Sequence, residues 1–167
     1  SFFHLAEPKF HAVFYGELFR RDKSWEDLPS VWRENKRTDA KWLIGQLRAK
    51  LAQDPAGRME PVRVLSIGSG VGYMEKILLE EMPELELHVN EPSTVGMKWL
   101  REDVPSDRIY VGLPPMCLPS DVQYDMIYLS TVDYGIPTRE FQHLLWELRA
   151  QLAPGGELVL LSASLLE

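Results

Sequence analysis

Three glycines within five residues follow a short apolar segment near the middle of the chain. Gly68, Gly70 and Gly72 stand in residues 62–78, VRVLSIGSGVGYMEKIL, between an expected strand and an expected helix. Glycine permits a sharp turn and lets a ligand approach the main chain without meeting a Cβ atom. The free N–H groups at the start of the following helix favour a phosphate or a carboxylate. The spacing therefore predicts a loop that holds part of a nucleotide-like ligand.

The glycine spacing also separates the candidate ligands. The dinucleotide fingerprint is G-x-G-x-x-G, and its third glycine would fall on Tyr73, whose ring is bulky. This departure weakens the interpretation as a nicotinamide or flavin enzyme, which stays open as a third possibility. A phosphate-binding P-loop is excluded because no Gly-Lys-Ser/Thr follows the glycines.

An acidic residue stands where the second expected strand ends. Glu91 lies in LHVNEPS, 19 residues after Gly72, and Pro92 follows it. A carboxylate at this point can accept hydrogen bonds from both hydroxyls of a ribose, and the proline offers a flat apolar surface to a purine. The alternative is a solvated charge in a loop.

The elements that must position these residues alternate between strands and helices. This alternation predicts an α/β fold, a doubly wound, Rossmann-like and mostly parallel sheet. A helix after Thr38 or Asp39 precedes the sheet, and Ser93 and Thr138 are expected to cap later helices. Pro154-Gly155-Gly156 is expected to break the chain before the last strand. The expected strands are 62–67, 85–90, 108–111, 124–129 and 158–161, and the helices between them are 72–81, 93–102 and 138–152.

The composition of the chain changes at about residue 60. Residues 1–60 are rich in aromatics and are expected to form a helical cap, whereas residues 61–167 form the ligand-binding core. Tyr15 and Phe19 are four residues apart, so they could line a lid over the site or simply pack in a core. A basic cluster is expected to form a solvated helix face, and it consists of Arg33, Lys36, Arg37 and Lys41. The alternative that this cluster binds an anionic group stays open.

Composition excludes several classes of protein. The chain has 167 residues, the size of one domain, and a net charge of −7. Residues 1–60 hold 11 Lys and Arg and 9 Asp and Glu. The remaining residues hold 7 Lys and Arg and 16 Asp and Glu, and this acidic part would repel a nucleic-acid backbone. No apolar run approaches the ~20 residues of a membrane span. A single cysteine, Cys117, favours a reducing cytoplasm, and scattered histidines make a metal site improbable.

Four segments in order resemble the class I S-adenosylmethionine-dependent methyltransferases. They are VLSIGSGVG, HVNEPS, YDMIYLSTVDYGI and LRAQLAPGGELVLLS, and the resemblance covers about residues 36–164. The serine form of the first motif, with EPS after the second strand, is locally similar to histamine N-methyltransferase and its relatives.

The resemblance implies the strand order 3-2-1-4-5, with S-adenosylmethionine as cofactor and S-adenosylhomocysteine as product. The loop would admit the methionine end of the cofactor, and Glu91 would hold the ribose. Pro92, Leu113 and Pro114 would flank the adenine, and Ser130 and Thr131 would line the wall near the sulfur. The implied cofactor-binding residues are Gly68, Ser69, Gly70, Gly72, Glu91, Pro92, Leu113, Pro114, Ser130 and Thr131, and the expected substrate contacts are Tyr15, Asp133 and Tyr134.

The chain also departs from the family pattern. The family usually has an acidic residue at the position of Ser66, where it helps to hold the methionine amino group, and another after the third strand, where this chain has Gly112-Leu113-Pro114. The chain stops after strand five of the usual seven, which predicts a C-terminally incomplete core or a covered edge, for example in a homodimer.

The expected activity is methyl transfer to a nitrogen or oxygen of a small molecule. The leaving group is neutral, so alignment matters more than an acid, and no catalytic residue is assigned. The alternative is a module that kept the fold and lost the chemistry, which the missing acid at Ser66 favours.

Overall fold

The computed structural model describes residues 25–53, 60–94, 96–132 and 136–161, and one five-stranded sheet forms the centre of this part. Its order is β3-β2-β1-β4-β5, and every neighbouring pair is parallel. The predicted doubly wound fold and its strand order are confirmed. The strands are β1 (Arg63–Ile67), β2 (Glu86–Glu91), β3 (Ile109–Val111), β4 (Tyr124–Ser130) and β5 (Leu152–Leu161).

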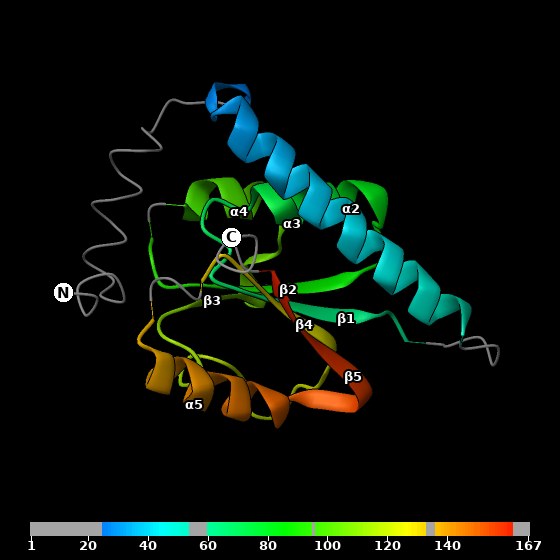
Figure 1. Cartoon of the computed structure of the whole chain (residues 1–167), viewed down its shortest axis with the longest axis vertical. Coiled ribbons are helices and arrows are strands. Elements are labelled where there is room, and N and C mark those ends of the chain that lie inside the picture. Colours follow the sequence, from blue (N-terminus) through cyan, green and yellow to red (C-terminus); the bar gives the residue numbers. More distant parts are fainter. Residues whose placement is uncertain (1–24, 54–59, 95, 133–135, 162–167) are drawn as a thin grey trace.

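Helices cover both faces of the sheet (Figure 1). One face carries α2 (Ser30–Ala52), α3 (Tyr73–Glu81) and α4 (Met97–Asp103), and the other carries α5 (Thr138–Arg149). Two short 3-10 helices, η2 (Trp25–Asp27) and η3 (Ser106–Arg108), complete the described elements. Because β4 lies between these layers, six consecutive residues of it are buried, as expected of a central parallel strand.

Helix α2 is part of the main hydrophobic core. Its side chains Ala40, Leu43, Ile44 and Leu47 are buried in one cluster with residues of α3, α4, β1, β2 and β4. A second cluster on the opposite face joins Leu144 and Leu148 of α5 to the sheet. The division of the chain at residue 60 stays a prediction, and residues 1–24 of the expected cap lie outside the described part.

Three helix starts differ from the prediction. Helix α2 begins at Ser30 rather than after Thr38 or Asp39, because its first turns pack against the start of α3. The rings of Trp32 and Tyr73 lie 5.6 Å apart between centroids. Helix α4 begins at Met97 rather than after Ser93, because the Ser93 N–H is held by the Glu91 carboxylate. Thr138 is the first residue of α5 and not its cap, a shift of one residue.

The segment Pro154-Gly155-Gly156 lies within β5 and does not precede it, so this expected break is wrong. Strand β5 starts at Leu152, and its register against β4 is irregular between Tyr124 and Met126. A Cβ atom on Gly156 would lie 2.7 Å from the Tyr124 carbonyl oxygen, so the glycine allows the two strands to stay close at this irregularity.

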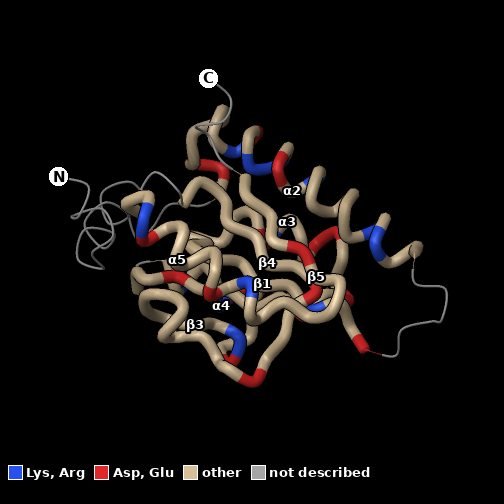
Figure 2. Tube along the Cα trace, turned by 60° about the horizontal axis from the view of Figure 1, so that its bottom comes forward, with Lys and Arg blue, Asp and Glu red and all other residues tan. Residues whose placement is uncertain are grey.

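Charged residues of both signs recur along α2 and around the sheet (Figure 2). Among the described helices, none combines the length and the apolar character that crossing a bilayer requires.

Candidate functional site

The glycine loop connects β1 to α3 in a conformation that requires its glycines. Gly68, Gly70 and Gly72 have φ angles of +69°, +63° and +76°, which side-chain-bearing residues rarely adopt. The N–H groups of Gly68 and Ser69 donate to the Asn90 carbonyl oxygen at 2.9 and 3.0 Å. The loop is therefore tied to the end of β2, as the predicted site needs.

Glu91 faces this loop and not the solvent. Its Oε2 accepts a hydrogen bond from the Gly70 N–H at 2.7 Å, and its Oε1 accepts one from the Ser93 N–H at 2.8 Å. The side chain is fully enclosed, and burial raises its pKa from 4.5 to about 7 against the opposing effect of the two N–H groups. Each carboxylate oxygen keeps a second lone pair beyond these two hydrogen bonds.

The start of α4 packs closely on the loop. A Cβ on Gly96 would lie 2.4 Å from the Gly70 carbonyl oxygen, and one on Gly72 would lie 2.4 Å from Cδ2 of Leu100. Larger residues at either position would therefore push the loop away from α4.

Glu75 is a functional candidate that sequence reasoning missed. It lies in the first turn of α3, and its Oε1 accepts hydrogen bonds from Ser66 Oγ at 2.5 Å and Tyr128 Oη at 2.6 Å. Its Oε2 is buried without a hydrogen-bond partner. Burial raises the pKa of this carboxyl, while the two hydroxyls and the charge of Lys36 oppose the rise. The structure thus places a buried carboxylate from α3 beside the Ser66 hydroxyl. An acidic residue in the turn after the glycines was the available signal.

Lys36 also departs from its predicted place. The expectation of a solvated basic face is wrong for this residue, whose Nζ donates to Ser130 Oγ at 2.6 Å and to Thr131 Oγ1 at 3.2 Å. Burial lowers the pKa of Lys36, and Glu75 and Asp39 oppose the shift. The ring of Trp32 lies 6.0 Å from the ammonium. Lys36 therefore joins α2 to the carboxyl end of β4.

A small pocket of about 20 Å³ opens between α2, the glycine loop and β4. It combines an aromatic wall, hydroxyls and one charge of each sign. Its lining residues are Trp32, Lys36, Ser66, Gly68, Ser69, Tyr73, Met74, Glu75 and Ser130. The hydroxyl oxygen of Ser69 is buried without a partner, as is Glu75 Oε2, so two polar atoms here are free to meet a ligand.

The residues expected around the adenine lie at the same edge of the sheet. Leu113 and Pro114 follow β3, Leu113 is 40% exposed, and Pro92 follows Glu91. The Asn90 side-chain amide donates to the Gly112 carbonyl oxygen at 3.0 Å, which ties the loop after β3 to β2. The carboxyl ends of the strands thus carry the predicted cofactor residues side by side. The expected substrate contacts Tyr15, Asp133 and Tyr134 lie outside the described residues.

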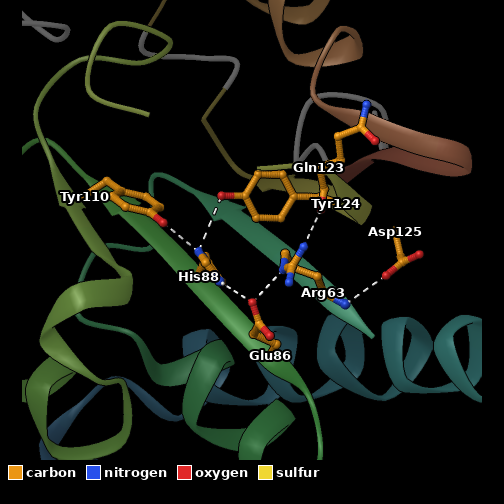
Figure 3. Close-up of polar contacts among 7 residues, drawn as sticks. All are labelled: Arg63, Glu86, His88, Tyr110, Gln123, Tyr124 and Asp125. Atoms are coloured by element: carbon orange, nitrogen blue, oxygen red, sulfur yellow. Dashed lines mark hydrogen bonds and ion pairs between the residues drawn. The ribbon is translucent and has the colours of Figure 1, made fainter. Parts of the chain in front are cut away.

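A second polar network occupies the amino-terminal half of the strands, away from the loop (Figure 3). His88 Nδ1 lies 2.7 Å from Tyr110 Oη, and its Nε2 lies 3.1 Å from Glu86 Oε1, which also pairs with Arg63. Tyr124 Oη lies 3.4 Å from His88 Nδ1, the nitrogen that also contacts Tyr110. Both ring nitrogens have partners, so His88 is a satisfied residue of the sheet.

Cys117 is not set up as a nucleophile. Its Sγ accepts a hydrogen bond from the Asn90 side-chain amide at 3.2 Å, and burial raises the pKa of the thiol. A raised pKa disfavours the reactive thiolate.

Comparison with known proteins gives matches at the level of structure only. No family model and no curated protein matches the sequence. Among solved structures, N-methyltransferase NodS from Bradyrhizobium japonicum WM9 in complex with S-adenosyl-L-homocysteine has a TM-score of 0.62 at 19% identity, over 90% of this chain and 71% of that one.

Two further methyltransferase structures match over most of the chain. CalS10, an amino pentose methyltransferase from Micromonospora echinaspora with bound SAM, has a TM-score of 0.55 at 22% identity, over 89% of this chain and 55% of that one. The glycopeptide N-methyltransferase MtfA, complexed with SAM, has a TM-score of 0.52 at 18% identity. The match covers 73% of this chain and 52% of that one. The chain spans about half the length of these two proteins. It has the fold of the S-adenosylmethionine-dependent methyltransferases.

Proposed function

We propose that this chain is an S-adenosylmethionine-dependent methyltransferase that acts on a nitrogen or oxygen of a small molecule. The observation that carries the proposal is the buried Glu91 carboxylate bonded to the glycine loop at the carboxyl edge of a sheet in 3-2-1-4-5 order. Ligands of open α/β sheets bind at this edge. The similar structures add support, because they include N-methyltransferases with SAM or S-adenosyl-L-homocysteine bound.

The residues present fit the proposed cofactor. Three glycines with positive φ leave the main chain of the loop open to the methionine end, and the unpartnered Ser69 Oγ and Glu75 Oε2 can bind its polar groups. The remaining lone pairs of Glu91 would accept hydrogen bonds from the ribose hydroxyls. Pro92, Leu113 and Pro114 would flank the adenine. When bound, the cofactor supplies an electrophilic methyl group on a positively charged sulfur.

The chain's own contribution to the reaction is positioning. Ser130 and Thr131 at the end of β4 form the wall beside the sulfur, and Tyr15, Asp133 and Tyr134 are the proposed acceptor contacts. Transfer needs nucleophile, methyl carbon and sulfur in line. An ammonium acceptor must first lose a proton.

Calorimetric titration of the chain with S-adenosylmethionine and S-adenosylhomocysteine tests the proposal. Wild type should bind both ligands, and Glu91→Ala should weaken binding by at least about 1.5 kcal/mol, because two charge-assisted hydrogen bonds are lost. The matched control is Glu84→Ala, which removes an exposed carboxylate in the turn before β2 and should leave both affinities unchanged. Equal affinities in wild type and Glu91→Ala would reject Glu91 as the ribose ligand.

The second candidate is a module of the same fold without chemistry. The narrow pocket and the Lys36 ammonium inside it favour this candidate. Turnover separates the two, because a methyltransferase should release S-adenosylhomocysteine when it is offered a library of amines and phenols. Binding without release under every condition would support the module.

The half-buried single thiol also fits a reducing compartment, which supports a cytoplasmic location.

A further inference from the structure

Lys36 differs from the other basic residues of α2 by its contacts. It donates to both Ser130 Oγ and Thr131 Oγ1, 94 and 95 residues further along the chain. Lys41, on the same helix, is exposed. Thr131 has a φ of +57°, and its own hydroxyl donates to the Ser130 carbonyl oxygen at 2.7 Å, so the lysine meets a tightly turned strand end. The ammonium is thus held in one place by two hydroxyls at the carboxyl end of β4.

The surroundings of this ammonium are those of a cation site. Glu75 from α3 and Asp39 from α2 are the acidic groups that act on it, and the Trp32 ring faces it. Glu75 Oε2 is buried in the same pocket and has no hydrogen-bond partner. A buried carboxylate with a free oxygen favours a positive group nearby. Lys36 supplies that group from within the chain.

This position conflicts with a second positive charge. The proposed function places the cofactor sulfur beside Ser130 and Thr131, where the Lys36 ammonium now bonds. The sulfur of S-adenosylmethionine is a cation, whereas that of S-adenosylhomocysteine is neutral, and the two molecules otherwise differ by one methyl group. Repulsion between two charges a few ångströms apart is strong where water is excluded. The conflict therefore applies to one of the two ligands only.

We propose that Lys36 determines which form of the cofactor this site prefers, and that it selects the neutral thioether over the sulfonium. This inference rests on the proposed function. To admit the sulfonium, the lysine must leave the two hydroxyls or give up its proton, and the free energy of that change is subtracted from binding. The thioether can bind with the lysine in place. Burial lowers the pKa of Lys36 and so reduces the free energy needed to remove its proton.

The test measures the dissociation constants of both ligands by calorimetry on the whole chain. Lys36→Met and Lys36→Gln remove the charge, and Gln keeps a donor for Ser130 and Thr131 if Met proves too unstable. Lys36→Arg keeps the charge, and Lys41→Met removes an exposed charge from the same helix. The neutral Lys36 variants should bind S-adenosylmethionine at least about tenfold more tightly, a factor well within the Coulomb energy of two close charges. Their affinity for S-adenosylhomocysteine should change much less.

Each outcome has one meaning. A shift in the ratio of the two affinities in both neutral variants, with Lys36→Arg and Lys41→Met like wild type, supports the proposal. An equal change for the two ligands, or none, overturns it and leaves the proposed function standing. If neither wild type nor any variant binds either ligand, the proposed function fails and this inference fails with it.

Discussion

At the scale of single residues, the environment of Glu91 links the candidate site to the stability of the fold. The carboxylate accepts two backbone hydrogen bonds at 2.7 and 2.8 Å, yet burial outweighs them and raises its pKa to about 7. The loop therefore holds a carboxyl group that titrates near neutral pH. Such perturbed groups concentrate at functional sites because they are costly to keep for structure alone.

The raised pKa of Glu91 predicts a loss of stability with rising pH. The Glu91 carboxyl binds its proton more tightly in the folded chain than in the unfolded chain, where its pKa is 4.5. Its contribution to stability is therefore complete below pH 4.5 and disappears as the pH rises through about 7. A tenfold change in proton affinity equals about 1.4 kcal/mol. Protonation of Glu91 therefore contributes about 3 kcal/mol to the free energy of unfolding at low pH.

Urea unfolding of wild type and Glu91→Gln between pH 4 and pH 8 measures this effect. The difference in unfolding free energy between the two proteins should change by about that amount over the range, because the amide does not titrate. Titrating groups that do not act on Glu91, such as His88, are common to both proteins and cancel. Parallel curves would show that the folded carboxyl is not perturbed.

At the scale of elements, α2 serves both the core and the candidate site. Its first turns place Trp32 and Lys36 at the pocket, and its middle buries Ala40, Leu43 and Leu47. The pocket therefore depends on how α2 packs against α3. A movement of this helix would change the Lys36 contacts directly.

Truncation of the buried side of α2 should destabilise the whole fold. Leu47 is fully buried among residues of the main cluster, so Leu47→Ala should lower the free energy of unfolding by about 2–5 kcal/mol. Val31, 72% exposed on the same helix, is the control, and Val31→Ala should cost less than about 0.5 kcal/mol. Chemical denaturation checks both variants. A small effect of Leu47→Ala would mean that α2 is separable from the core.

At the scale of the whole molecule, the described sheet has two outer strands, β3 and β5. Within the described residues, β5 pairs with β4 only, and it exposes Leu160 to 41%. Unpaired strand edges invite association. We propose that two chains pair through β5, which would cover this edge.

Sedimentation equilibrium should then give a mass near twice 19.2 kDa at high concentration. Leu160→Lys should shift the equilibrium toward the monomer, because it places a charge at the proposed contact. Val111→Lys, which changes a residue 45% exposed on the other outer strand, should have no such effect. A monomer at every concentration would reject the dimer.

Local patterns in the sequence were enough to determine the alternation of strands and helices, the glycine loop and the acid at the end of β2. These features depend on neighbours in the chain: apolar runs, glycines that allow positive φ, and the length between β1 and β2. For the same reason the sequence predicted that Glu91 and the loop would serve one ligand, and the structure places them in direct contact.

Only the tertiary structure decided the place of Lys36 and Glu75 and the course of β5. A lysine in a basic cluster is solvated unless a distant element buries it, and here the hydroxyls at the end of β4 do so. Glu75 matters through Ser66 and Tyr128, contacts that no local pattern encodes. Pro154-Gly155-Gly156 reads as a break, yet pairing with β4 carries the strand through it. Long-range packing outweighs local preference at these positions because burial and hydrogen bonding contribute more free energy than propensity does.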